Sequence, residues 1–304
     1  MGTFAVEGIK SVSINGASLA YIERGTGEPV VFVHGGYSDL RTWLAQIPAF
    51  AQEYRAIVYS RRYARPNKDI QKGQDDQMMP HVDDLADLLV ALDAVPVHLV
   101  GNSWGAFICL LAAVKQPALV RTLVLCESPV LPLLVSNVPK PQEIIRMLLH
   151  RPRTAIALLN FGIKIIQPTE KAYRQGDYEK GTRAFIRGIL GADAYDVLPG
   201  ARKEQMQENE STNVAQMLGA GFPLLTEAEV RGVTAPTLLI TGERSTTLLR
   251  RDLTLRLADF LPNVRHVEIQ EASHIMHEQR PSAFNEEVLS FLHHYSDSIA
   301  LNRS

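Results

Sequence analysis

Short apolar runs that alternate with helical segments constrain the fold of this chain more strongly than any other feature of its sequence. The later runs are continuous in Val, Ile and Leu, which suits strands that are covered by helices on both faces. The pattern therefore predicts a doubly wound α/β protein with a mostly parallel sheet. Strands are expected at Val12–Ile14, Leu19–Arg24, Val30–Val33, Ala56–Tyr59, Val97–Val100, Thr122–Cys126, Thr237–Thr241 and Val267–Ile269. Helices are expected at Leu40–Ala51, Val82–Leu92, Trp104–Lys115, Leu248–Phe260 and Ser282–His293.

The alternation stops between Pro129 and about Arg231, where helical patterns separated by Pro and Gly follow one another. Ligands of open α/β sheets bind at the carboxyl ends of the strands, and this segment directly follows a strand end. We therefore expect a helical cap over that edge rather than an extension unrelated to any site. The expected division is a core of residues 1–128 and 232–304 with an inserted cap of residues 129–231.

The composition excludes several classes of partner. The chain has 304 residues and a net charge of −2, which provides no basic field for nucleic acid and no polybasic membrane anchor. No apolar stretch approaches the roughly 18 residues of a membrane span, and the N-terminus lacks a signal-peptide pattern. We expect a cytoplasmic protein whose partner is a small-molecule substrate, with no nucleic-acid or membrane partner. The apolar surroundings of Cys109 and Cys126 predict buried free thiols.

The stretch HLVGNSWGAFICLLAA, residues 98 to 113, carries the pattern G-x-S-x-G with Ser103 at its centre. In this pattern a tight turn from strand to helix holds a serine in a strained backbone conformation, and the glycines allow the strand and the helix to approach closely. The amides of the helix N-terminus favour a developing anion there. Because an apolar strand precedes the pattern and an apolar helix follows it, we predict that Ser103 is a nucleophile.

A serine nucleophile needs a base, an acid that orients the base, and donors for an oxyanion. The sequence HGG at residues 34–36 ends a predicted strand, so the N–H groups of Gly36 and Trp104 are predicted to form the oxyanion hole. His274 follows the last predicted strand, at the same sheet edge as Ser103, and is the predicted base. His34 is expected to brace its own loop by hydrogen bonding.

Two further charged or metal-binding patterns are expected to have no catalytic role. His277 lies three residues after His274, but the H-E-x-x-H order and helical context of a zinc site are missing. We expect a packing role for His277, no metal and no cofactor. The loop of residues 60–77 mixes basic and acidic residues and is expected to be solvated rather than to bind an anionic substrate.

These motifs make the chain resemble the α/β-hydrolase fold superfamily, in the branch with a helical cap. The residues that carry the resemblance are His34–Gly36, Gly101–Gly105 and Ala272–His274, with Pro281 after them. The resemblance covers nearly the whole chain. It implies a triad of serine, acid and histidine in that chain order. It also implies that the insertion, residues 129–231, is the cap that shapes the substrate pocket.

The acid departs from the pattern of the family that this chain resembles. Members usually carry an aspartate after the penultimate strand, where this sequence has Ser245. Glu243 lies in the same loop, whereas Glu127 ends the predicted strand Thr122–Cys126. Some capped members that resemble haloalkane dehalogenases place the acid after this earlier strand. We favour Glu127 as the acid that orients His274, with Glu243 as the alternative.

The serine narrows the reaction that the resemblance implies. Dehalogenases and epoxide hydrolases of this fold attack with an aspartate, whereas position 103 is a serine. The leading hypothesis is a serine hydrolase that cleaves an ester, or a carbon–carbon bond beside a carbonyl, of a small apolar substrate through an acyl-enzyme. A cofactor-free perhydrolase or haloperoxidase with the same triad is one alternative. A non-catalytic small-molecule receptor is an alternative from a different class.

Overall fold

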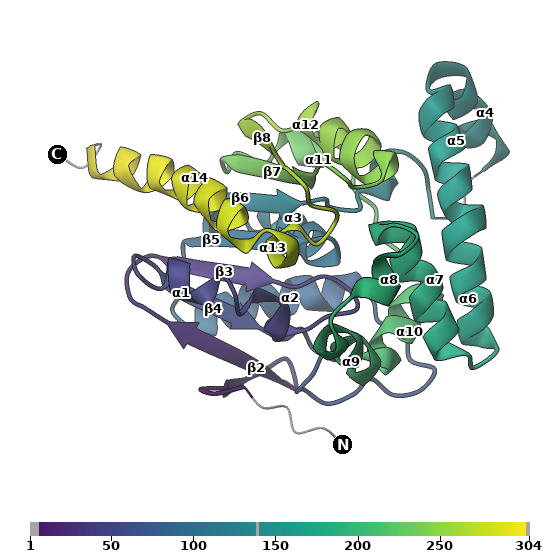
Figure 1. The fold of residues 1–304 in the computed structure, drawn as a ribbon. Coiled ribbons are helices and arrows are strands. Elements are labelled where there is room, and N and C mark those ends of the chain that lie inside the picture. The colour runs from purple at the N-terminus through teal and green to yellow at the C-terminus, as the bar shows by residue number, and fades with distance from the viewer. Residues whose placement is uncertain (1–5, 138–139, 302–304) are drawn as a thin grey trace.

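A sheet of eight strands runs through the molecule (Figure 1) in the computed structural model, which describes residues 6–137 and 140–301. The pairs β1–β2 and β2–β4 are antiparallel, and the other five pairs are parallel. The mostly parallel α/β sheet predicted from the apolar runs is thus confirmed. Across the sheet the strands are β1 (Lys10–Ile14), β2 (Ala17–Arg24), β4 (Arg55–Tyr59), β3 (Pro29–Val33), β5 (Val97–Asn102), β6 (Val120–Cys126), β7 (Thr237–Gly242) and β8 (Val264–Ile269).

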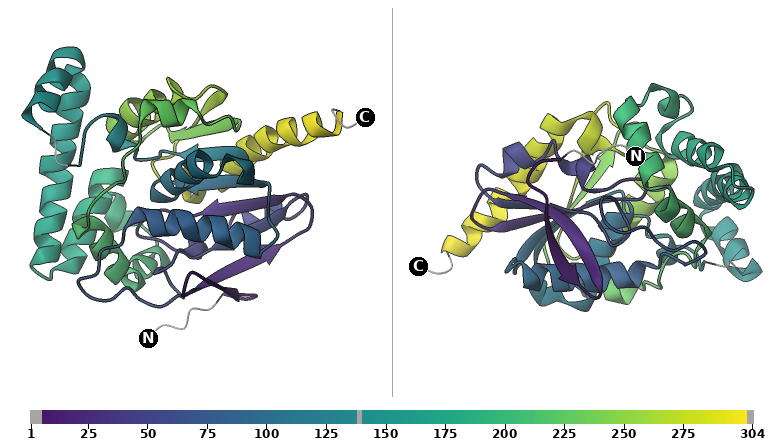
Figure 2. Two further views of the ribbon diagram at one scale, coloured as in Figure 1. Left: turned by 180° about the vertical axis from the view of Figure 1, so that it is seen from behind. Right: turned by 90° about the horizontal axis from the view of Figure 1, so that it is seen from below.

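Helices cover both faces of the sheet (Figure 2), which explains why the central strands are apolar throughout. Strand β3 shows the arrangement: Val31 and Val33 belong to one core cluster, and Val30 and Phe32 belong to the other. Successive side chains of a strand point to opposite faces, so each face of β3 is buried against a separate layer of helices. Every residue of β5 and β7 is buried.

The helices of the two layers differ from the expected ones at two places. The predicted helix Leu40–Ala51 is divided into a 3₁₀ turn and a short helix, because Pro48 in the first turn of the second piece cannot continue a preceding helix. The predicted helix Leu248–Phe260 begins with π-type hydrogen bonding. The layers contain η1 (Leu40–Trp43), α1 (Ile47–Phe50), α2 (Met78–Ala91), α3 (Trp104–Lys115), η2 (Pro117–Leu119), η5 (Leu248–Leu255), α12 (Arg256–Ala258), α13 (Met276–Gln279) and α14 (Pro281–Leu301).

A helical insertion connects β6 to β7, and the regular elements of its described residues are all helices. It lies at the edge of the sheet toward which the arrowhead of β3 points (Figure 1). The division of the chain into core and cap at residues 128 and 231 stays a prediction. The insertion contains η3 (Leu131–Leu133), α4 (Pro141–His150), α5 (Pro152–Phe161), η4 (Gly162–Ile166), α6 (Gln167–Arg174), α7 (Tyr178–Leu190), α8 (Ala194–Val197), α9 (Gly200–Glu208), α10 (Glu210–Leu218) and α11 (Glu227–Arg231).

Two sequence-based expectations concern the interior and the membrane. Cys109 and Cys126 are buried and unpaired, as their apolar surroundings predict. Within the described ranges, no helix combines the length and the apolar character that crossing a bilayer requires.

Candidate active site

Ser103 lies in the turn between β5 and α3, and its backbone is strained there. Its φ of 52° and ψ of −119° fall in a region that side-chain-bearing residues rarely adopt. A Cβ at Gly101 would lie 2.6 Å from the Cα of Ala106, and a Cβ at Gly105 would collide with the carbonyl oxygen of Val33. Both glycines of the G-x-S-x-G pattern are therefore required by close backbone approach, which is the geometry that the sequence predicts.

A cavity of about 810 Å³ brings the predicted residues together. Ser103 and His274 line it, and so do Gly36 and Trp104. The residues that come from the insertion are largely apolar, so the cavity has a polar end at the sheet and an apolar wall opposite. Apolar residues that line it include Leu131, Val135, Ile144, Leu158, Phe161 and Ile166.

Glu127 is the carboxylate that contacts His274. Its Oε2 lies 2.6 Å from Nδ1 of His274, and its Oε1 accepts a hydrogen bond of 3.0 Å from the backbone N–H of Gly242. The Glu127 side chain is fully buried, and its backbone has a φ of 45°. A carboxylate at Nδ1 favours the tautomer that carries the proton there, which leaves Nε2 as the basic nitrogen of the ring.

The alternative acid lies elsewhere. Glu243 is exposed, and its Oε2 accepts a hydrogen bond of 2.8 Å from the backbone N–H of Glu271. Ser245, at the position of the usual aspartate, is buried, and its hydroxyl has no hydrogen-bond partner among the described residues. The structure thus brings Glu127, and not Glu243, to His274.

The oxyanion-hole candidates face the same cavity from two elements. Trp104 is the first residue of α3, and the amides of a first helical turn have no acceptor within the helix. His34 is fully buried beneath the loop of Gly36, where its Nε2 accepts a 3.0 Å hydrogen bond from the backbone N–H of Arg61. Burial holds the pKa of His34 well below its usual value, so this residue braces the loop as a neutral ring.

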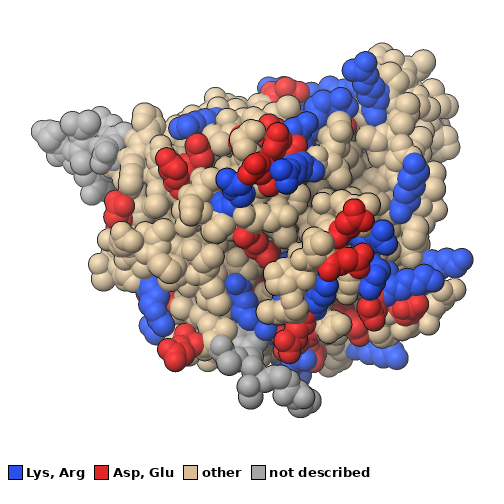
Figure 3. Space-filling model, viewed as in Figure 1, with Lys and Arg blue, Asp and Glu red and all other residues tan. Residues whose placement is uncertain are grey.

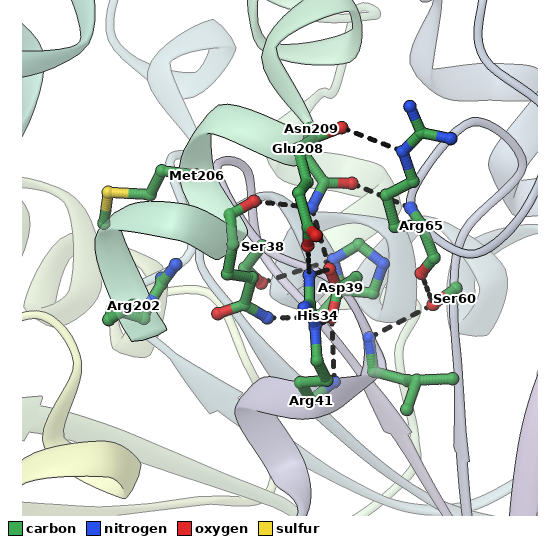
Figure 4. A network of polar contacts seen from close by, with 12 residues as sticks. His34, Ser38, Asp39, Arg41, Ser60, Arg65, Arg202, Met206, Glu208 and Asn209 are labelled. Carbon is green, nitrogen blue, oxygen red and sulfur yellow. Dashed lines mark hydrogen bonds and ion pairs between the residues drawn. The ribbon is translucent and has the colours of Figure 1, made fainter. Parts of the chain in front are cut away.

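A buried polar network ties the insertion to the loop that carries Gly36 (Figure 4). Asp39, which follows that loop, accepts hydrogen bonds of 2.8 Å from the side chains of Gln205 and Asn209. Arg41 donates to the same carboxylate at 2.9 Å. Because the bonds from Gln205 and Asn209 are buried, they hold α9 and its C-terminal end firmly against the oxyanion loop.

His277 is buried away from the reactive pair. Its ring stacks on Trp43 with 4.1 Å between centroids, and its Nε2 lies 3.1 Å from the hydroxyl of Thr42. Burial lowers the pKa of His277 to about 4. The packing role expected for this histidine is therefore present. The described part of the chain contains no group of three or more His, Cys, Asp or Glu side chains arranged as metal ligands would be.

The expectation that the loop of residues 60–77 is solvated is wrong for Arg61. This arginine is 2% exposed and donates to the carbonyl oxygens of His34 and Gly35 at 3.1 and 2.9 Å. Its guanidinium also lies 4.5 Å from the ring centroid of Trp104. Burial lowers its pKa to about 10. One buried cation thus contacts both elements that carry the oxyanion-hole candidates.

The same loop supplies Asp76, which sequence reasoning also missed. Asp76 is 4% exposed and lines the cavity. Its two oxygens are engaged by Nε2 of His81 and by the amide of Gln216, each at 2.7 Å. Gln216 lies 140 positions away, so no local pattern in the sequence could indicate this cluster.

The comparisons with known proteins agree with this fold. Residues 30–287 match the alpha/beta hydrolase family. The match spans most of the chain, and the chain therefore belongs to this family of α/β-hydrolase-fold enzymes.

Curated relatives of different activities cover nearly the whole chain. A candidate non-heme bromoperoxidase, BpoC of Mycobacterium tuberculosis, is 29% identical over 285 residues, covering 90% of this chain and 97% of the relative. A candidate carbamate hydrolase, RutD of Pantoea ananatis, is 25% identical over 267 residues, covering 87% of this chain and 88% of the relative.

Solved structures of esterases and lactonases share the fold. A thermophilic esterase from Thermogutta terrifontis superposes with a TM-score of 0.73 at 19% identity, covering 94% of this chain and 98% of its own. An enol-lactonase from Burkholderia xenovorans superposes with a TM-score of 0.68 at 19% identity, covering 93% of this chain and 99% of its own. At this level of identity the likeness shows the fold alone.

Proposed function

We propose that this protein is a serine hydrolase that cleaves an ester of a small apolar substrate through an acyl-enzyme on Ser103. One observation carries the proposal. Ser103 and His274 line one cavity, and Nδ1 of His274 lies 2.6 Å from the buried carboxylate of Glu127. A serine on a strained turn, an imidazole and an orienting carboxylate are the groups that acyl transfer to water requires.

The proposed reaction has two halves. The hydroxyl oxygen of Ser103 attacks the ester carbonyl, and Nε2 of His274 takes the hydroxyl proton while Glu127 stabilises the imidazolium. The N–H groups of Gly36 and Trp104 stabilise the oxyanion. The C–O bond then breaks, and the leaving alcohol takes the proton from His274. In the second half a water molecule gives a proton to His274 and attacks the acyl-enzyme. The bond between the acyl carbon and the Ser103 oxygen then breaks, that oxygen takes the proton from His274, and the acid is released.

The apolar wall of the cavity supports an apolar acyl group. Each methylene that leaves water contributes about 0.8 kcal/mol, equivalent to a factor of about four in kcat/KM when the transition state buries it fully. We expect kcat/KM for p-nitrophenyl esters to rise from acetate through hexanoate and then to level as the acyl chain fills the cavity. A profile that is flat or falls from acetate onward would contradict an apolar acyl site. A carbon–carbon bond beside a carbonyl is a second substrate type for the same groups.

A perhydrolase or haloperoxidase is the second candidate function, and the 29% identity to BpoC favours it. In that reaction hydrogen peroxide would replace water as the nucleophile that attacks the acyl-enzyme, forming a peracid. The test compares ester hydrolysis with bromination of monochlorodimedone in acetate, peroxide and bromide. Bromination that depends on Ser103 and exceeds hydrolysis would favour the second candidate. If neither reaction occurs with any ester, the non-catalytic receptor becomes the better account.

We expect Arg61 to act through the oxyanion hole rather than on the substrate. Removing one oxyanion donor commonly costs about 10²–10³ in kcat. Arg61→Met leaves the donors present but removes the contacts that hold the backbone around them in place. We therefore expect kcat to fall by roughly tenfold to a hundredfold while KM changes little. Affinity for an aryl boronic acid, which forms a tetrahedral adduct on a serine, should fall in parallel.

Arg62→Met provides the matched control for this measurement. Arg62 is the neighbouring arginine, and it pairs with Asp84 rather than with the oxyanion loop. We expect this variant to keep kcat and boronate affinity within about threefold of the parent. Equal falls in kcat in the two variants, or a rise in KM alone for Arg61→Met, would show that Arg61 only supports the fold.

A further inference from the structure

Exposed apolar side chains gather on one part of the insertion. Among the described residues, eleven large apolar side chains are exposed, and six of them lie within residues 145–163 of α4, α5 and η4. Exposed apolar side chains that gather in one part of a protein mark interaction sites. We call these six residues the apolar rim: Ile145, Leu148, Leu149, Ile156, Leu159 and Ile163.

The spacing of the rim shows two stripes. Its three residues on α4 are spaced i, i+3 and i+4, and the three on α5 and η4 are spaced i, i+3 and i+7. Residues with such spacings share one face of a helix. Other residues of the two helices, Met147 and Ala155, have buried side chains that face the rest of the protein. The rim is therefore additional to the residues that pack these helices on the rest of the protein.

Basic residues are interspersed with the rim residues along the same helices. Five exposed basic residues lie between positions 140 and 164, and the single acidic residue of that span, Glu143, is hydrogen-bonded to the hydroxyl of Ser136 at 2.7 Å. The whole chain has a net charge of −2, so positive charge is concentrated here. Figure 3 shows blue and tan atoms over the region of α4 and α5. The basic residues are Lys140, Arg146, Arg151, Arg153 and Lys164.

The rim continues into the cavity. Leu159 and Ile163 are exposed members of the rim, and both also line the cavity that contains Ser103. Leu158, which is partly buried, lines it as well. Two residues of the exposed rim thus also form part of the cavity wall.

We propose that the apolar rim docks on an anionic lipid surface. The six apolar side chains would enter the boundary between headgroups and acyl chains, while the interspersed Lys and Arg side chains contact anionic headgroups. The positive charge argues against a second copy of this chain as the occupant, since two such faces would repel each other. Docking would place the cavity beside a reservoir of apolar compounds.

This proposal departs from the sequence-based expectation of no membrane partner. That expectation rested on the missing polybasic run and the missing membrane span. Here the basic residues are dispersed among apolar ones over two helices. Only the structure shows that the basic and the apolar side chains are both exposed. The proposal does not depend on catalysis by Ser103, because docking is measured without turnover.

The test is cosedimentation of the protein with two kinds of vesicle, one of phosphatidylcholine alone and one with phosphatidylglycerol added. We expect binding to the anionic vesicles only, with weakening as salt rises. Arg146→Glu with Arg153→Glu should weaken binding by about fivefold or more for each residue changed. Leu149→Ser with Ile156→Ser should weaken it at least tenfold.

Matched controls lie outside the rim. Val197 and Leu224 are 78% and 83% exposed, so Val197→Ser with Leu224→Ser removes as much exposed apolar surface elsewhere and should leave binding unchanged. Equal binding to both vesicle types, binding to neither, or equal losses in the rim and control variants would overturn the proposal. So would a concentration-dependent dimer that the rim variants abolish, because a second copy would then be the occupant.

Discussion

Replacing Ser103 with alanine is expected to lower kcat on an activated ester by about a millionfold, while the protein stays folded. Losses of this order follow when one member of a triad is removed, because the remaining groups cannot form the covalent intermediate. Ser103 lies at a turn, lines the cavity and is only partly buried, so removal of its hydroxyl should cost little stability. Rates and thermal unfolding of the two proteins give the measurement.

Combining this change with His274→Ala sharpens the test. The two residues act as one unit in the proposed mechanism, so the double variant should be hardly slower than either single variant. Retention of more than about a tenth of the parent activity in Ser103→Ala would remove Ser103 from the mechanism.

Replacing Glu127 with glutamine is expected to lower kcat by roughly four orders of magnitude, as an amide isostere does in the serine-protease template. Glutamine has nearly the same shape, and its amide oxygen can still accept the hydrogen bond from Gly242. Its NH₂ group, however, would face Nδ1 of His274 and favour the tautomer with the proton on Nε2. That tautomer cannot accept the proton of Ser103.

Glu243→Gln is the matched control for the acid. Glu243 is exposed and contacts the backbone of Glu271 rather than His274, so this variant should lose about tenfold or less. If Glu243→Gln is nearly inactive and Glu127→Gln is active, then Glu243, in the loop after β7, is the orienting acid. Two active variants would mean that Ser103 and His274 work without an orienting carboxylate.

The eight strands could be predicted from the sequence because the pattern that indicates each strand lies within the strand itself. A run such as Val30–Val33 is apolar at every position, and that pattern alone indicates a strand buried on both faces. The turn around Ser103 was accessible because the G-x-S-x-G pattern is contiguous in the sequence, although the carbonyl oxygen that requires Gly105 belongs to Val33 of β3. Local patterns of this kind are preserved whatever the rest of the chain does.

The acid and the supporting residues depend on contacts between distant positions. Both Glu127 and Glu243 follow strands at the catalytic edge of the sheet, and the sequence favours the first without excluding the second. Only the fold shows that Glu127 reaches His274, 147 positions away. Arg61 looks like one of several loop charges in the sequence, and its burial follows from carbonyl oxygens that the β3 loop presents to it.

Labelling with a fluorophosphonate probe tests the central claim most directly, because the probe reacts with a serine hydroxyl only where a base and an oxyanion hole activate it. We predict that one probe adds per chain, that peptide mass spectrometry finds it on Ser103, and that Ser103→Ala is not labelled. Labelling should be much slower in His274→Ala than in His277→Ala. An unlabelled folded protein, or a probe found on another residue of both the parent and Ser103→Ala, would contradict the account.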